Sequence, residues 1–183
     1  MANVKILVRG YLPDDTEKGS CSTISLVQDK DLNIVVDPGT LKDPDLLVKS
    51  LADHDLKTDD INIIFLTHSH MDHYRNIGLF PKAKALDYWG YWEKDLMTDA
   101  DEKITDDLSF IRTPGHSDDS ITLLVKTDKG LIAICGDVFW KENFPEKDKY
   151  ATDPKKLEES RKKILETADF VIPGHGEMFD VEK

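Results

Sequence analysis

Apolar residues along this chain gather in short runs of strand length, and polar or turn-forming residues separate the runs. The run at 61–67 (INIIFLT) is nearly continuous, which is typical of a strand buried on both faces. Asp128-Lys129-Gly130 lies between two such runs and predicts a hairpin turn. The strands that this pattern predicts span residues 4–8, 20–28, 33–37, 61–67, 106–113, 120–127, 131–135 and 170–172.

Two segments carry the signals of a helix start instead. In Asp43-Pro44 and Asp153-Pro154 an aspartate at the cap position precedes a proline at the first helical position. The second helix is expected to run to about residue 167 and to turn inward Leu157, Ile164, Leu165 and Ala168. Strands interrupted by helices at intervals favour an α+β layered fold, with helices outside a pair of sheets. The chain has 183 residues, and we therefore expect a single domain spanning 1–183.

Net charge and composition indicate which binding partners and which cell compartment to expect. The formal net charge is −12, which disfavours nonspecific attraction to nucleic acid or anionic lipid. Cys21 and Cys135 are expected to be reduced, buried thiols. The N-terminus has the pattern of a strand rather than a signal peptide, and no apolar stretch approaches the ~18 residues of a membrane span. We therefore expect a cytoplasmic protein with no membrane partner.

Candidate metal ligands concentrate in a few short motifs that follow the predicted strands. Three histidines and an aspartate fall within Thr67-His68-Ser69-His70-Met71-Asp72-His73, and two further histidines end the motifs TPGH and PGHG. Imidazole and carboxylate suit Zn²⁺ and neighbouring divalent ions. The candidate ligands are His68, His70, Asp72, His73, His116, Asp137 and His175.

These residues can be divided between two cation sites. His68, His70 and His116 would form one site, Asp72, His73 and His175 the other, and Asp137 would bridge the two ions. For Asp72 and His73 to join, the chain must turn into a helix after an extended His68-Ser69-His70 segment. A single structural zinc, or buried histidines that bind no metal, is the alternative, but closed structural sites are usually rich in cysteine. Neither cysteine lies in these motifs.

In these motifs and their order, the chain resembles the metallo-β-lactamase superfamily. Val36-Asp37-Pro38-Gly39 is similar to an early turn of that family, and THSHMDH, TPGH, GD and PGHG to its successive metal motifs. The resemblance implies a four-layer αββα sandwich of two mixed sheets, and the ligand roles above. It also implies that Asp37 supports the metal ligands or the local structure. The alternative is that Asp37 is simply a carboxylate in a turn. Asp137, where many true β-lactamases carry cysteine, resembles the glyoxalase II and phosphodiesterase branches, and we expect a small stand-alone metallo-hydrolase domain.

Three segments are candidates for the wall of a substrate pocket. The loop 10–19 carries Tyr11, and Lys141 lies in an aromatic segment after Asp137. Lys141 would bind a carboxylate or phosphate, with a solvated lysine as the alternative. The aromatic segment 88–92 is the third candidate, and core packing or a dimer contact is the alternative for each of the three segments. The charged run 146–149 is expected to be a solvated loop.

The sequence therefore predicts a metal-dependent hydrolase that holds two Zn²⁺ ions, with Fe or Mn as alternatives. A metal-bound hydroxide would attack a small ester, thioester, lactone or amide, including β-lactams as promiscuous substrates, while Asp72 orients the nucleophile and moves its proton. A nuclease or phosphodiesterase acting on RNA or DNA is the alternative function, and an iron-dependent redox protein ranks below it. A small molecule is the expected partner; nucleic acid and a second copy of the chain in a homodimer are the alternatives.

Overall fold

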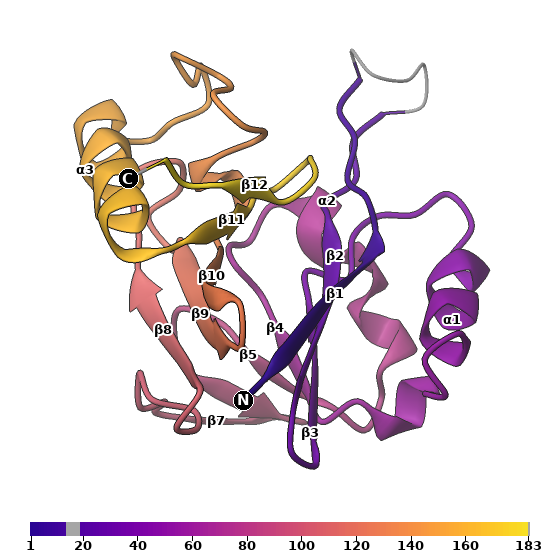
Figure 1. Ribbon diagram of the computed structural model, residues 1–183. Helices are drawn as coiled ribbons and strands as arrows, with labels where there is room; N and C mark the ends of the chain where they lie inside the picture. The colour runs from indigo at the N-terminus through magenta and orange to yellow at the C-terminus, as the bar shows by residue number, and fades with distance from the viewer. Residues whose placement is uncertain (14–18, 183) are drawn as a thin grey trace.

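A computed structural model describes residues 1–13 and 19–182. Two sheets pack face to face, with helix α1 (Asp45–Ala52) outside one sheet and helix α3 (Pro154–Thr167) outside the other (Figure 1). Helix, sheet, sheet and helix succeed one another across the molecule. The four-layer α+β sandwich expected from the sequence is thus confirmed.

The first sheet has seven strands in sequence order. They are β1 (Asn3–Val8), β2 (Ile24–Asp29), β3 (Leu32–Val36), β4 (Ile63–Phe65), β5 (Lys84–Leu86), β6 (Tyr91–Glu93) and β7 (Leu96–Thr98). The neighbours β3, β4 and β5 run parallel, and the remaining pairs are antiparallel. The sheet is therefore mixed, and its parallel strands end at the same edge.

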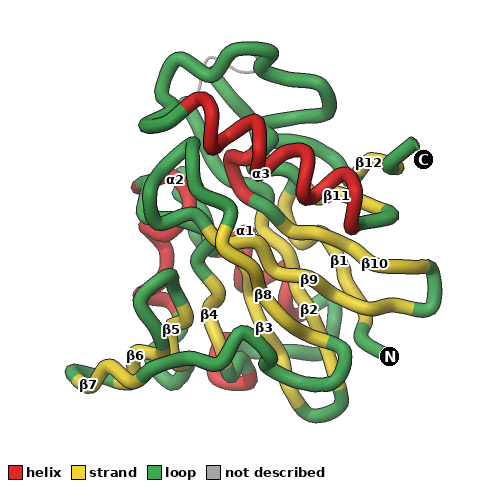
Figure 2. The backbone as a smooth tube through the Cα atoms, turned by 90° about the vertical axis from the view of Figure 1, so that its left-hand side faces the viewer, coloured by secondary structure: helices red, strands yellow, loops and turns green. Residues whose placement is uncertain are grey.

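The second sheet has five strands in the order β12-β11-β10-β9-β8. They are β8 (Leu108–Arg112), β9 (Ile121–Thr127), β10 (Gly130–Ile134), β11 (Phe170–Ile172) and β12 (Phe179–Asp180). Strands β10 and β11 pair in parallel, with α3 as the crossover between them. Figure 2 shows α3 lying across the outside of this sheet.

Side-chain alternation along the strands produces three apolar layers. On β2, Val27 belongs to the core between the sheets, whereas Leu26 packs on the α1 side. On β9, Leu123 likewise enters the central core, and Leu124 packs on the α3 side. Each sheet therefore needs apolar residues on both faces, which explains the continuous apolar runs in the sequence.

Some predicted boundaries differ from the structure. The strand expected at 20–28 begins only at Ile24, because the backbone just before it bonds to loops: Ser22 N donates to Asp72 O and Thr23 N to Gly174 O. On α3, Leu165 is 38% exposed rather than inward, while Ser160 is buried in the helix interface. None of the helices in the described part of the chain is long and apolar enough to cross a membrane.

Candidate metal centre

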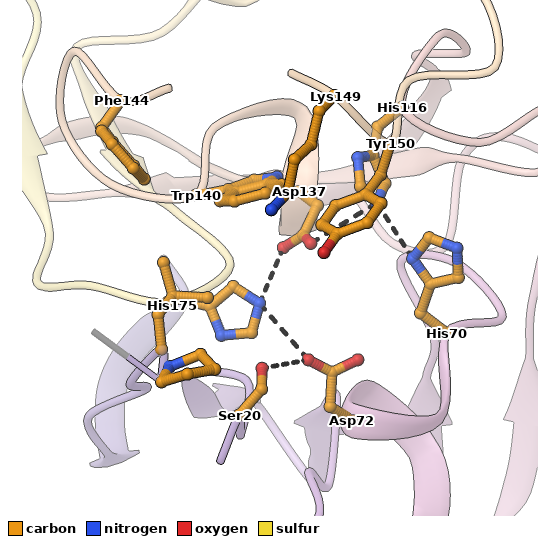
Figure 3. Close-up of a pocket in the computed structure, with 12 residues that line it drawn as sticks. Ser20, His70, Asp72, His116, Asp137, Trp140, Phe144, Lys149, Tyr150 and His175 are labelled. Atoms are coloured by element: carbon orange, nitrogen blue, oxygen red, sulfur yellow. Dashed lines mark hydrogen bonds and ion pairs between the residues drawn. The ribbon is translucent and has the colours of Figure 1, made fainter. Parts of the chain in front are cut away.

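The predicted ligands all lie at one end of the sandwich, on segments that follow strands. His68 and His70 follow β4, and the short helix α2 (Met71–Tyr74) then carries Asp72 and His73, as the sequence required. The other ligands come from the second sheet: His116 after β8, Asp137 in the short helix η3 (Gly136–Val138) after β10, and His175 after β11. Figure 3 shows side chains from these segments converging on one cavity.

Three ring nitrogens meet in the first donor group. His70 Nδ1 lies 2.9 Å from both His68 Nε2 and His116 Nε2. Asp137 Oδ2 lies 3.4 Å from His116 Nε2 and completes the group. Three imidazoles whose ring nitrogens converge on one point are arranged to bind a cation.

The second donor group shares Asp137 through its other oxygen. Asp137 Oδ1 lies 3.3 Å from His73 Nε2 and 3.2 Å from His175 Nε2. Asp72 Oδ2 lies 3.6 Å from His175 Nε2. The donor atoms of Asp72, His73 and His175 lie no more than 4.8 Å apart, and so do those of the first group. The carboxylate of Asp137 thus stands between the two groups and offers one oxygen to each.

Hydrogen bonds on the outer ring nitrogens fix the direction of the inner ones. His73 Nδ1 lies 2.8 Å from Asp37 Oδ2, and His175 Nδ1 lies 2.9 Å from the carbonyl oxygen of Cys21. An acceptor at Nδ1 holds the proton there and leaves the Nε2 lone pair directed inward. Asp37 also accepts bonds from Thr67 N and Thr67 Oγ1, at 2.8 and 2.7 Å. Asp37 therefore supports the ligand loop from a buried position.

Two buried atoms test whether a divalent cation fits this centre. His73 Nε2 and Asp137 Oδ1 are both buried and lie 3.3 Å apart, but neither makes a hydrogen bond of acceptable geometry. A buried polar atom without a hydrogen bond is costly, and two such atoms that face each other are suited to share a cation. Imidazole nitrogen and carboxylate oxygen are the donors that Zn²⁺ takes, and the donor sets therefore fit it.

The electrostatics of the centre favour the same conclusion. Burial and the neighbouring imidazoles, His73 first, hold the pKa of His68 well below its usual range. Burial alone would raise the pKa of Asp137, but His73 and His175 hold it well below the ordinary value. Burial would lower the pKa of His73, yet the carboxylates of Asp137 and Asp37 raise it well above that of a free histidine. A cation at His73 Nε2 would take the place of a proton on that nitrogen, while the proton on Nδ1 would stay bonded to Asp37.

Two glycines let the backbone approach the ligands closely. A Cβ on Gly136 would lie 2.2 Å from Thr67 Oγ1, and this residue has φ +52°. A Cβ on Gly174 would lie 1.9 Å from Asp137 Oδ1. Gly136 is thus required by the close approach of Thr67, and Gly174 by that of Asp137.

A cavity of about 550 Å³ opens onto the donor atoms. Its wall combines ligands with aromatic and aliphatic side chains and with a lysine whose side chain points toward the ligands (Figure 3). Trp140 and Tyr150 stack with ring centroids 5.7 Å apart. The lining residues are Leu12, Pro13, Ser20, His70, Asp72, His116, Asp137, Trp140, Phe144, Lys149, Tyr150 and His175.

Only some of the residues expected to form the cavity wall lie at the cavity. Leu12 from the loop 10–19 lines the cavity, whereas Tyr11 pairs with Cys21 and packs against the α1-side core. The rest of that loop, 14–18, lies outside the described residues. Lys141 is not among the lining residues, although its neighbour Trp140 is. The aromatic segment 88–92 borders other hollows, away from the metal centre.

Three polar residues of the site, Asp148, Lys149 and Ser20, escaped the sequence interpretation. The run 146–149 was expected to be solvated, but the Asp148 side chain has no exposed surface and its Oδ2 lies 2.6 Å from His116 Nδ1. The expectation of a solvated loop is therefore wrong at Asp148, and Lys149 lines the cavity. Ser20 Oγ donates a hydrogen bond to Asp72 Oδ2. Nothing in the spacing of Asp148 or Ser20 signals these contacts, because their partners lie far away in sequence.

Comparisons with known proteins agree with this geometry. The family model of the metallo-beta-lactamase superfamily matches residues 21–107. A Xenopus laevis protein, metallo-beta-lactamase domain-containing protein 1, is 31% identical over an alignment of 194 positions, gaps included. The alignment covers 99% of this chain and 82% of that protein. The human protein of the same name is 32% identical over 81% of this chain, which spans 59% of its length.

Solved structures show the same fold at lower identity. A Thermotoga maritima protein described as a metallo-beta-lactamase superimposes with a TM-score of 0.77 at 20% identity, covering 98% of this chain and 99% of that one. AidC, a dizinc quorum-quenching lactonase, superimposes with a TM-score of 0.66 at 17% identity, covering 95% and 84% of the two chains. The sequence match over nearly the whole chain, together with the clustered histidines and aspartates, shows that this protein belongs to the metallo-β-lactamase superfamily of metallo-hydrolases.

Proposed function

We propose that this protein is a dinuclear zinc-dependent hydrolase that cleaves a small ester or lactone, with thioesters and amides as related substrates. The observation that carries the proposal is the position of Asp137, whose two oxygens face two separate groups of inward-directed imidazoles. A carboxylate shared in this way suits a pair of cations rather than one. The dizinc lactonase AidC, with the same fold, supports this choice.

Each cation would have its own set of protein ligands. His68, His70 and His116 would hold one, Asp72, His73 and His175 the other, and Asp137 would contact both. When bound, such cations lower the pKa of water toward neutrality and polarise a carbonyl group.

Asp72 is the residue placed to move a proton. Its side chain is 26% exposed and lines the cavity, whereas Asp137 is only 7% exposed. Ser20 Oγ donates to Asp72 Oδ2 and thereby fixes the orientation of the carboxylate. In the hydrolysis that we propose, a water oxygen attacks the carbonyl carbon and the acyl C–O bond breaks. Asp72 accepts the proton of that water and returns it to the departing alkoxide, so the products are an acid and an alcohol.

The cavity wall supports a small, partly apolar substrate. A volume of about 550 Å³ accommodates a small molecule, and Trp140, Tyr150 and Phe144 supply ring surfaces. Among the described lining residues, Lys149 is the single lysine or arginine. Long nucleic acid relies on several phosphate contacts, and a chain of net charge −12 disfavours them.

A substrate panel with metal analysis tests the proposal. Metal-free protein would be loaded with Zn²⁺, Mn²⁺ or Fe²⁺ and assayed on a lactone, an ester, a thioester, a β-lactam, a phosphodiester and labelled RNA. We expect two zinc ions per chain and the highest kcat/KM on the lactone or ester. Binding of fewer than about one ion per chain would refute the dinuclear centre. Cleavage of RNA or the phosphodiester alone would replace the proposal with the nuclease alternative.

A further inference from the structure

The segment 148–153 lies along the loop that carries the ligand His116. Thr152 N donates to His116 O at 3.1 Å, and Asp153 N donates to Gly115 O at 3.0 Å. Asp153 also caps α3, because its Oδ1 accepts from the backbone N–H groups of Lys155 and Lys156. The ligand loop and the start of α3 are therefore joined through this segment.

Asp148 contributes a carboxylate whose two oxygens serve different partners. Oδ2 lies 2.6 Å from His116 Nδ1, and Oδ1 accepts a hydrogen bond from Tyr150 N at 2.8 Å. The first contact holds the proton of His116 on Nδ1 and directs Nε2 toward His70 and Asp137. The second contact fixes the turn that leads into Tyr150.

The residues that follow Asp148 form part of the substrate wall. Lys149 and Tyr150 both line the cavity, and the Tyr150 ring stacks on Trp140 at an interplanar angle of 22°. In Figure 3 these side chains stand over the ligand cluster, on the same side as His116. One carboxylate thus contacts a metal ligand and, through the adjacent turn, the surface that a substrate would touch.

We propose that Asp148 is a positioning residue that fixes the orientation of His116 and of the Lys149–Tyr150 wall together. This inference rests on the proposed function, since it assigns His116 to a bound cation. Its consequence is that loss of the Asp148 carboxylate affects cation binding and substrate binding at once. Loss of the Tyr150 ring affects substrate binding alone, because the backbone N–H of that residue remains.

Four variants separate these effects: Asp148→Asn, Asp148→Ala, Tyr150→Leu and Asp118→Asn. Asp148→Asn is nearly isosteric and keeps an acceptor for Tyr150 N, so it guards against a failure to fold. Asp118→Asn is the matched control, since Asp118 is an exposed neighbour that accepts from Thr152 Oγ1 at 3.3 Å, without a contact to His116. Zinc affinity would be measured by competition with a chromogenic chelator, and the visible spectrum would be recorded with Co²⁺. KM and kcat would be measured on the best substrate of the panel.

We expect both Asp148 variants to bind one of the two cations about 10–100-fold more weakly, with an altered Co²⁺ spectrum. Asp148→Ala, which also removes the acceptor of Tyr150 N, should raise KM more than Asp148→Asn does. Asp118→Asn should match the unmodified protein in every measurement, and Tyr150→Leu should raise KM without changing zinc affinity. If the unmodified protein binds two cations and the Asp148 variants bind them equally well, the role of Asp148 is refuted while the proposed function stands. If the unmodified protein binds none, both proposals fail.

Discussion

Replacement of Asp37 by asparagine tests whether the hydrogen bonds of this carboxylate to Thr67 and His73 hold the metal centre in place. Asp37 is 2% exposed and accepts three hydrogen bonds, two from Thr67 and one from His73 Nδ1. Its φ is +49°, a conformation that asparagine tolerates better than most residues. Asp37→Asn therefore preserves the turn and the side-chain shape, and changes only the charge and one acceptor.

The amide cannot reproduce the carboxylate in either orientation. If its NH₂ group faces Thr67 N, two donors oppose each other, and a buried donor without a partner costs about 1–3 kcal/mol. If the NH₂ group faces His73, the ring must accept at Nδ1 and carry its proton on Nε2. That nitrogen is the one directed at Asp137, so His73 loses its lone pair for a cation.

Two measurements on Asp37→Asn follow from this geometry. Urea denaturation in EDTA should show a free energy of unfolding about 1–3 kcal/mol below that of the unmodified protein. Zinc affinity, measured by chelator competition, should fall about 10–100-fold. Asp31→Asn, at an exposed turn residue between β2 and β3, is the control and should change neither value. An Asp37→Asn protein that binds two zinc ions with unchanged affinity would refute the argument from the His73 tautomer.

Three further variants test other parts of the structure. Asp137→Ala should reduce turnover by several orders of magnitude while the far-UV circular dichroism in EDTA stays unchanged; full activity would exclude a shared carboxylate. Gly174→Ala should weaken zinc binding, because its Cβ would lie 1.9 Å from Asp137 Oδ1, whereas Gly78→Ala, with no atom within 4 Å of its Cβ, should not. At Asp153, hydrogen bonds to the backbone of α3 lower the carboxyl pKa, so the cap contributes stability above the unfolded pKa and loses it as pH falls through the folded pKa. Asp153→Ala should lower the melting temperature at neutral pH, and Asp153→Asn should keep the cap without this pH dependence; equal melting curves for all three proteins would count against the cap.

Long apolar runs predicted the centre of the fold well. The run at 61–67 contains β4, which pairs with β3 and β5 in the middle of its sheet, and the 120–127 run contains β9. Strands β5, β6, β7 and β12 were missed, because each has only two or three residues and mixes charged or polar residues with apolar ones, unlike the all-apolar β11 (FVI). So short a segment has no periodicity to detect.

The clustered histidines and aspartates predicted which residues meet, since the motifs follow strands whose ends share one edge. Sequence reasoning did not find Asp148, whose partner His116 lies 32 positions earlier in the chain. A run of alternating charges usually indicates a solvated loop, and here tertiary packing overrides that rule for one residue of the run. Contacts of this kind depend on how the loops fold over one another, which local patterns do not encode.

The origin of the ligands has a consequence for how the protein is assembled. His68 and His73 come from the half of the chain that builds the first sheet, and His116 and His175 come from the half that builds the second. Each donor group takes residues from both halves of the chain. A fragment that ends after β7 would therefore lack some ligands of each group, and the remaining C-terminal fragment would lack the others. Full metal affinity would therefore return only when the two fragments reassociate, so metal uptake would report correct docking between the halves.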